Sequence, residues 1–415
     1  MKTNPRLLKL LHLAAPALAV LATGRAHAAW EYVPDLSVLV ESTDNVLVDS
    51  DGEESASRTV LDLGVTLSNF TQRGEVVVEP RLTSDYFAKS QHRDLETEDK
   101  YLDLRGNYTW QKLGVGFSTA YSNESTLRAE FASAVPGDPD LEEPVDVDTG
   151  RLALNETRTY LANRVNVDFL LSQRSSLGLE LRQAEVSYSE QSLLRDFRSD
   201  FDDTSIAVLL RRQTNQRNQI SARLFVSEYS AKANANETDS VGLSGTFTRP
   251  FTQTWTFDLS AGVQRSDFRF RLPGTTDFID NADTNYTFGM GLRKRGQRSL
   301  WTISMNRSLD PNSAGHVVVR DQLRAYLQRQ LTPRLGGQFG VRWFSYEALD
   351  EARSDDDRTY ARAELTFEYT LKRTLFLFFG MDALNQKYEG EDAANATSLF
   401  VGLTYRGLSH RDEMR

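Results

Sequence analysis

Charged residues recur at alternate positions inside apolar segments of this chain. Glu79 and Arg81 follow three valines, while Arg164 and Asp168 flank Val165 and Val167. Carboxylate and guanidinium groups in such arrays pair with one another and hydrogen-bond polar solutes, and no histidine accompanies them in these segments. We therefore expect a polar surface rather than an active site, lined by Glu79, Arg81, Asp103, Arg105, Arg164, Asp168, Glu180, Arg182, Arg223, Arg293, Arg342, Arg362 and Glu364.

Bond-making chemistry has little support in the sequence. After the first 28 residues there are three histidines, His92, His316 and His410, and none lies in an alternating segment where it could serve a serine. An Asp–His protease around His92 remains a weak alternative. The chain has no cysteine and no metal-spaced histidine cluster. The acidic run at 49–53 begins like a calcium loop but lacks its twelfth ligand, which leaves a divalent bridge to lipopolysaccharide as a minor alternative. We predict no catalytic residues, no metal and no cofactor.

The elements that carry these charges are strands. In the stretch from Tyr101 to Ser122, Leu102, Leu104 and Tyr108 alternate with polar residues, and the alternation resumes after a short basic turn. Period-two alternation predicts a hairpin with one apolar face. In a soluble protein that face would cover a core, whereas in an outer-membrane barrel it would meet lipid.

The same hairpin pattern repeats along the whole chain. It predicts about eighteen strands (16–18), the first near 35–42 and the last near 397–406. The connections alternate between short basic or neutral turns, such as WQKLG, and long acidic loops, such as EALDEARSDDD. Short turns on one rim and long loops on the other are typical of a closed antiparallel transmembrane β-barrel. A soluble all-β protein would have to split into several sandwiches or propeller blades, and no linker or repeat indicates that.

The apolar faces fit a wall that contacts lipid. Leu61, Leu63, Val65 and Leu67 share one face, and charges placed there would cost about 2–4 kcal/mol each for Arg or Lys. Aromatic residues near strand ends are typical of the girdles at membrane interfaces. The predicted girdle consists of Trp110, Trp255, Trp301, Trp343 and Tyr405.

The two ends of the chain differ from the rest. Residues 1–28 combine a basic start, an apolar run and Ala26-His27-Ala28, which predicts a secretory signal cleaved between Ala28 and Ala29. We expect the barrel over 29–406 and a short periplasmic tail over 407–415. The signal holds four basic residues and no acidic ones, so 44 basic against 58 acidic groups remain, or −14. Such an acidic exported chain is a poor partner for nucleic acid. An even strand number places both termini in the periplasm.

Eighteen strands enclose an aqueous lumen unless a loop obstructs it. The longest loop, near 123–156, is a candidate constriction, under the hypothesis that part of it folds inward, with Asp138, Asp140, Glu142, Glu143, Asp146 and Asp148 as its charged residues. A solvated external loop is the alternative.

Short motifs resemble one family. Thr43-Asp44-Asn45 follows the first strand, Pro311-Asn312-Ser313-Ala314-Gly315 precedes a later one, and Leu331-Thr332-Pro333-Arg334 ends it. These segments resemble the outer-membrane β-barrel porins that accompany exopolysaccharide and exosortase-type surface systems. The resemblance implies an outer-membrane location and polysaccharide passage, and it identifies no catalytic residues. The last predicted strand departs from outer-membrane barrels, which usually end on an aromatic residue, because Tyr405 is followed by a tail.

Taken together, the sequence predicts a porin-like outer-membrane channel for polar solutes, possible partners being a small polar solute or a polysaccharide. Outer-membrane lipid, lipopolysaccharide and the barrel assembly machinery are the expected surroundings. A non-conducting adhesive barrel that binds partners through its acidic loops is the alternative, and a barrel hydrolase is a third.

Overall fold

The structure, a computed structural model, describes residues 30–50, 52–89, 92, 95–126, 156–189, 199–232, 236–271, 278–311, 316–349 and 357–408. Within those ranges no helix is long and apolar enough to cross a bilayer. The predicted signal segment and most of the tail lie outside the described residues.

Eighteen strands form the fold, as the alternating pattern predicts. Their bounds are β1 Trp30–Thr43, β2 Ala56–Phe70, β3 Gly74–Phe87, β4 Glu98–Thr109, β5 Leu113–Ser125, β6 Thr157–Ser172, β7 Ser175–Tyr188, β8 Phe201–Gln213, β9 Gln219–Ala231, β10 Asn236–Pro250, β11 Trp255–Arg271, β12 Phe278–Arg295, β13 Ser299–Pro311, β14 Val317–Gln330, β15 Leu335–Ala348, β16 Arg358–Lys372, β17 Leu375–Tyr388 and β18 Ala394–Arg406.

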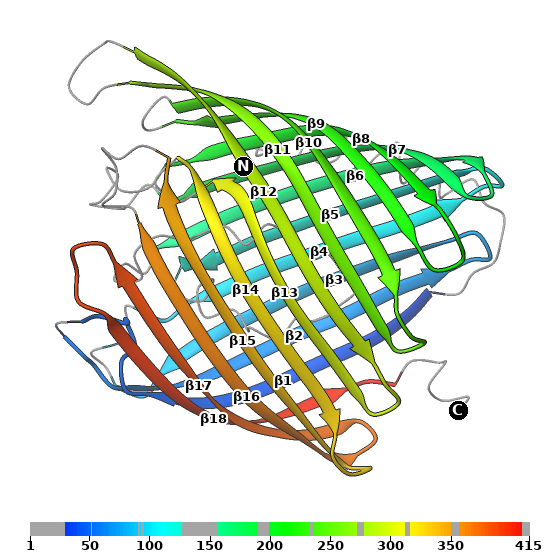
Figure 1. Cartoon of the computed structure of the whole chain (residues 1–415). Coiled ribbons are helices and arrows are strands. Elements are labelled where there is room, and N and C mark those ends of the chain that lie inside the picture. Colours follow the sequence, from blue (N-terminus) through cyan, green and yellow to red (C-terminus); the bar gives the residue numbers. More distant parts are fainter. Residues whose placement is uncertain are drawn as a thin grey trace, which may run out of the picture.

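The strands form one closed antiparallel barrel. Each strand pairs with the next in sequence, and β18 pairs with β1 from Asp35 opposite Arg406 to Thr43 opposite Ser398. Closure gives every strand two neighbours, so no free sheet edge remains along the seam. The start of β1 and the end of β18 lie at the rim with the short turns, and the long connections lie at the other rim (Figure 1). The prediction of a single closed barrel is confirmed.

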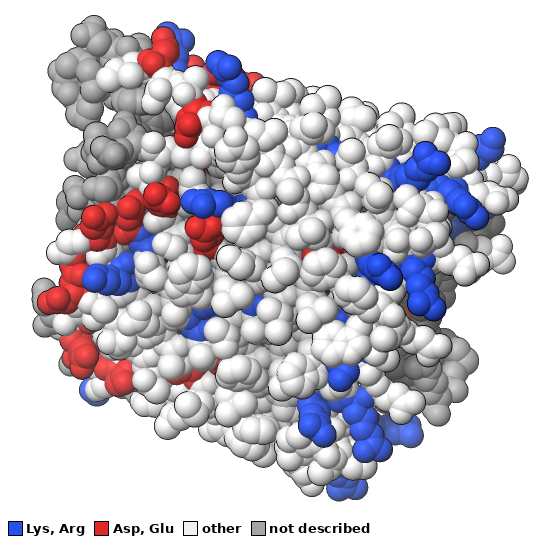
Figure 2. Space-filling view, in the orientation of Figure 1, with Lys and Arg blue, Asp and Glu red and all other residues white. Residues whose placement is uncertain are grey.

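The outer wall is an apolar belt between two charged rims. Leu179, Leu224 and Leu243 each expose about half of their side chains, although they lie in mid-strand. In the face seen in Figure 2, the acidic residues gather toward the long-loop rim, where some basic residues accompany them, and basic residues gather at the short-turn rim, with a mostly uncharged band between the rims. A continuous exposed apolar surface of this kind is a membrane-facing wall.

Strand β1 begins earlier than the sequence predicts. The predicted start near 35 follows Pro34, whereas the strand starts at Trp30. Residues 30–33 pair with β2 alone, because the β18 ladder ends opposite Asp35 and Gly407, just beyond β18, donates to Pro34 O at 2.8 Å. Proline is tolerated at this position, since its missing N–H points to the side where the β18 ladder has ended and breaks no bond with β2.

The wall separates between β12 and β13 near the long-loop rim. Strand β12 pairs with β13 only from Phe288 opposite Arg307 to Arg295 opposite Leu300, while it pairs with β11 along its whole length. Strand β13 stays paired with β14 as far as Pro311. The upper part of the β13–β14 hairpin, meaning the part near the long-loop rim, therefore leaves the cylindrical wall. Strands β11 and β12 continue along that wall.

Candidate functional site

The candidate site is the inner wall of the barrel. Thirteen charged residues were predicted for a polar face. In their strands they alternate with the exposed apolar side chains, so they lie on the inner face. Register then fixes which of them meet, because residues directly opposite on neighbouring strands have adjacent side chains. Glu79 lies opposite Asp103, Arg164 opposite Arg182, and Arg342 opposite Arg362.

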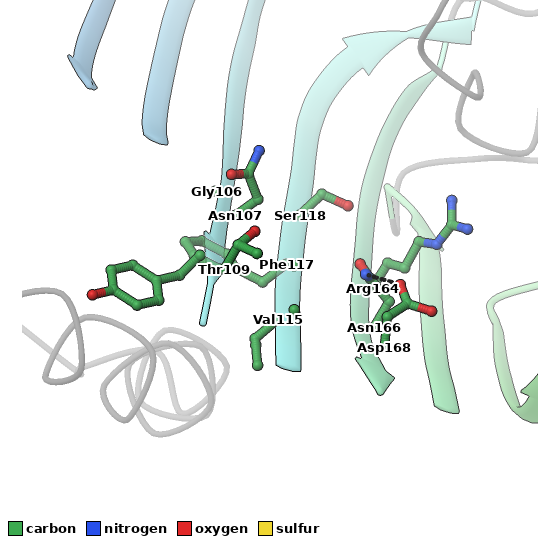
Figure 3. Close-up of a pocket in the computed structure, with 12 residues that line it drawn as sticks. Gly106, Asn107, Thr109, Val115, Phe117, Ser118, Arg164, Asn166 and Asp168 are labelled. Atoms are coloured by element: carbon green, nitrogen blue, oxygen red, sulfur yellow. Dashed lines mark hydrogen bonds between the residues drawn. The ribbon is translucent and has the colours of Figure 1, made fainter. Parts of the chain in front are cut away.

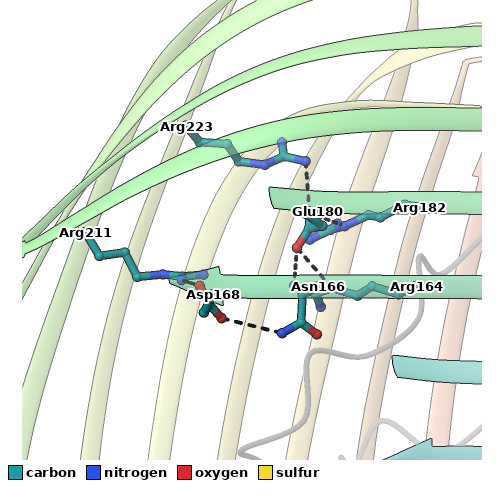
Figure 4. Close-up of polar contacts among 7 residues, drawn as sticks. All are labelled: Arg164, Asn166, Asp168, Glu180, Arg182, Arg211 and Arg223. Atoms are coloured by element: carbon teal, nitrogen blue, oxygen red, sulfur yellow. Dashed lines mark hydrogen bonds and ion pairs between the residues drawn. The ribbon is translucent and has the colours of Figure 1, made fainter. Parts of the chain in front are cut away.

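One cluster centres on Glu180 of β7, which is 2% exposed. Its carboxylate accepts from Arg164 of β6 at 2.5 Å, lies 2.7 Å from Arg182 Nε, and accepts from Arg223 of β9 at 3.2 Å. Three guanidinium groups thus converge on one carboxylate (Figure 4). A cluster with more cations than anions leaves net positive charge on this part of the wall.

Asp168 of β6 extends this network toward the short-turn rim. It pairs with Arg211 of β8, and Asn166 donates to it at 3.5 Å. Beside it the wall is hollowed, because the inner face of β5 carries Gly114, Gly116 and Ser118 (Figure 3). The hollow has a volume of 330 Å³ and is bounded on one side by the polar side chains of β6.

A second positive region lies on β14 to β16. Arg324, Arg342 and Arg362 are directly opposite one another in register, which places three like charges in one row. Like charges in such pairs repel. Arg362 is held by Glu364 and by Asp382 of β17, both at 3.7 Å.

An aromatic row lies next to these arginines, nearer the long-loop rim. Phe344 and Tyr360 are opposite one another and stack with ring centroids 4.6 Å apart and an interplanar angle of 8°. Arg342 lies 5.3 Å from the Phe344 centroid, and Arg320 and Arg358 approach the same ring from the next row at 5.2 and 5.6 Å. Such cation–π contacts offset part of the repulsion between the arginines.

The wall formed by β1 to β4 carries mixed charge. Arg105 pairs with Glu79 at 3.2 Å, and Arg81 lies 4.3 Å from the ring centroid of Tyr101. Asp103 occupies an inner position of β4 opposite Ala120. Elsewhere on the wall, Arg293 occupies an inner position of β12 opposite Thr302. The inner surface therefore presents both signs rather than one uniform field.

Several inner charges were missed by the sequence analysis. Arg58 binds Glu41 at 2.9 Å and Asp85 at 3.3 Å, and Arg158 binds Glu124 at 2.9 Å. The same pattern that predicted the others could have found them, since they lie an even number of positions from inner residues of the same strand. The missed residues include Glu41, Arg58, Asp85, Glu124, Arg158, Arg320, Arg324, Arg358 and Asp382.

The predicted aromatic girdle is partly exposed on the outer wall. Trp110, Trp301 and Tyr405 are among the exposed aromatic side chains, and Trp255 and Trp343 are half-buried. Trp30 and Tyr286, which were not predicted, are more exposed, at 59% and 74%. Trp30 was missed because the strand begins before Pro34. Tyr286 lies inside a segment predicted as strand, near 285–293, but it was not assigned to the girdle.

The remaining predicted positions are the candidate constriction residues, the cleavage site and the histidines. The constriction residues Asp138, Asp140, Glu142, Glu143, Asp146 and Asp148 lie outside the described residues, as do Ala28, Ala29 and His410. His92 is buried beside Phe87 and 3.8 Å from Glu54, so it packs inside a loop rather than facing solvent at the rim. In the part of the chain described, no group of three or more His, Asp or Glu residues could hold a metal ion.

Comparisons with known proteins give similarity in fold alone. No protein-family profile matches the chain, and no curated protein matches it significantly. Among solved structures, OccAB4 of Acinetobacter baumannii is 12% identical over 92% of this chain and 99% of its own, with a TM-score of 0.45. OccK2 of Pseudomonas aeruginosa, solved with glucuronate, is 10% identical over 92% and 98%, with a TM-score of 0.46. A BenF-like porin of Pseudomonas fluorescens is 9% identical over 91% and 98%, also with a TM-score of 0.46.

Proposed function

We propose that the protein is an outer-membrane channel through which small polar solutes diffuse. The observation that carries this proposal is the pairing of an apolar outer wall with a charged inner wall in a closed barrel of eighteen strands. At this strand number the interior is too wide for wall side chains to fill, so water occupies it. Opposed carboxylates and guanidinium groups along that interior would solvate polar solutes and exclude apolar ones.

Conductance tests the proposal directly. The purified barrel, added to a planar lipid bilayer in salt solution, is expected to give discrete current steps, and liposomes containing it should swell in solutions of small sugars. Heat-unfolded protein from the same preparation is the control. Folded protein that inserts but gives neither current nor swelling would contradict the channel.

We further propose the orientation and processing that the sequence indicates. The short, basic turns and both barrel ends would face the periplasm, with the acidic rim outside, where divalent cations link it to lipopolysaccharide. Cleavage after Ala28 would leave Ala29 as the first residue, and residues 407–415 would form a periplasmic tail. The mass of the protein purified from outer membranes and the protease sensitivity of a C-terminal tag in intact cells test these assignments.

A surface barrel that binds partners without conducting is the second candidate. The acidic residues along the long-loop rim in Figure 2 favour it, since they offer a binding surface for cationic partners. Passage of exopolysaccharide, the finer expectation from the family resemblance, stays a proposal too. Release of labelled polysaccharide from proteoliposomes, compared with release of a monosaccharide, distinguishes a polysaccharide route from a pore for small solutes.

A further inference from the structure

The connection between β1 and β2 folds into the barrel. Val48 is buried in a cluster with Phe344, Tyr360, Leu384 and other residues of the inner wall from β14 to β18. Those strands lie on the β18 side of β1, so the connection folds over the inner wall on that side. Val48 therefore occupies lumen that would otherwise be open at the long-loop rim.

The first residues of the connection are held in place on two sides. The Asn45 amide donates to Asp49 O at 2.8 Å and to Asn395 O at 2.9 Å, which fastens it to the beginning of β18. Val46 packs with Ala56, Phe87 and Leu95, the last from the neighbouring β3–β4 connection. These contacts hold the segment in one position against the wall.

The backbone of Val48 also indicates a fixed position. Its φ is 52°, in the left-handed region that β-branched residues rarely adopt. Such a conformation persists only where the surrounding contacts determine it. The burial of its side chain among aromatic rings provides those contacts.

The beginning of β14 approaches the same place from another direction. Val318 belongs to the cluster that holds Val48, while the adjacent Val317 packs against Tyr160, Val186, Phe201 and Tyr229 on β6 to β9. His316 Nδ1 lies 2.6 Å from the Asn236 amide at the start of β10. The upper β13–β14 hairpin, which has left the cylinder, thus reaches the opposite wall.

We infer that the pore's narrowest point lies at the long-loop rim and is formed by two inward segments, the β1–β2 connection and the beginning of β14, which come together in the cluster that includes Val48 and Val318. The inference rests on the proposed channel and names the residues that set its size limit. It assigns the constriction to these segments in place of the acidic loop near 123–156. Because the meeting point is apolar, it selects solutes by size, and the charged wall beneath it then contacts what has passed.

A triple substitution, Val46→Gly, Leu47→Gly and Val48→Gly, tests this constriction. It removes the anchoring side chains without shortening the chain, so the segment should leave the wall. Single-channel conductance is expected to rise about two-fold or more, since the lumen of an eighteen-stranded barrel is wide, and larger sugars should begin to swell liposomes. Deletion of residues 134–150 is the comparison and should leave conductance near the wild-type value.

A cysteine pair provides a second, independent measurement. The chain contains no other cysteine, so Val48→Cys with Ala396→Cys should crosslink on oxidation of the folded protein, because both positions belong to one cluster. Val48→Cys with Phe225→Cys, on the other wall, should not. The crosslinked channel should conduct like the wild type.

The outcomes separate the two proposals. If neither the wild type nor the glycine variant conducts, the channel itself is wrong. If the wild type conducts and the glycine variant is unchanged, or only the deletion of 134–150 raises conductance, the constriction lies elsewhere and the channel stands. Failure of the Val48–Ala396 pair to crosslink in folded protein would also overturn the constriction.

Discussion

At the scale of single residues, Glu180 compensates a charge arrangement that the sheet would otherwise oppose. Arg164 and Arg182 are directly opposite in register, and Arg223 reaches the same point from β9. Guanidinium groups held this close repel one another, and a carboxylate with several charge-assisted hydrogen bonds offsets that repulsion. One acidic residue therefore fixes the conformation of three basic ones.

Glu180→Gln should destabilise the barrel and alter its ion selectivity. The amide keeps the shape but not the charge, and loss of hydrogen bonds to charged groups costs about 1.5–3 kcal/mol. We expect a lower urea midpoint for unfolding from lipid vesicles and a reversal potential shifted toward anions. Asp392→Asn, the same charge change in the exposed β17–β18 connection, should affect neither. Equal shifts in the two variants would mean that net charge alone is responsible.

At the scale of elements, the closing seam between β18 and β1 depends on close backbone approach. Gly402 of β18 lies opposite Leu39 of β1 and opposite Phe378 of β17, whose ring covers it. A Cβ at this position would lie 2.5 Å from Val38 O, which is too close for any side chain. Aromatic rings placed over glycines are a recognised means of fixing register in sheets.

Gly402→Ala should weaken the seam. The added methyl group must displace both a ring and a backbone carbonyl, and overpacking of this kind costs about 1–3 kcal/mol. The urea midpoint and the fraction of heat-resistant folded barrel on gels measure the loss. Gly245→Ala on β10 is the matched control, because its Cβ would have 3.8 Å to the nearest atom. A Gly402 variant as stable as the Gly245 variant would refute this account of the seam.

At the scale of the whole molecule, two solvents define the barrel. Apolar side chains face outward along the belt, and charges face the lumen, so the fold is inverted relative to a soluble protein. Adjacent residues of one strand can therefore have opposite tolerances for charge. Leu259 and Ser260 of β11 provide such a pair, the former exposed on the outer wall and the latter paired with Thr246 and Gly289 inside.

Leu259→Arg should destabilise the membrane-inserted barrel by about 2–4 kcal/mol, the usual penalty for arginine on a lipid-facing position near the bilayer centre. Ser260→Arg places the same group in the aqueous lumen and should cost little. Equilibrium refolding into lipid vesicles measures both variants. If the serine variant were the less stable of the two, the lipid and water faces would be assigned the wrong way round.

The sequence by itself determined the antiparallel order and an approximate strand number, sixteen to eighteen, and it indicated which residues of a strand share a face. It could do so because each strand separates lipid from water, which forces alternation with period two. The prediction was wrong at strand ends where that contrast disappears. In the upper parts of β11 and β12 both faces meet water, so polar residues follow one another and strand was taken for loop. Trp30 was missed for a different reason, because proline was read as a boundary.

Only the tertiary structure decided which charges meet and what narrows the mouth. Register brings Arg164, Arg182 and Arg223 to Glu180, and residues 43 positions apart, Glu180 and Arg223, have no local sign of their pairing. The inward fold of Val48 onto Phe344 likewise depends on contacts between opposite ends of the chain. Alternation records only the solvent on each side of a strand. Contacts between side chains of different strands depend on strand register and on closure of the barrel, and no single segment encodes either.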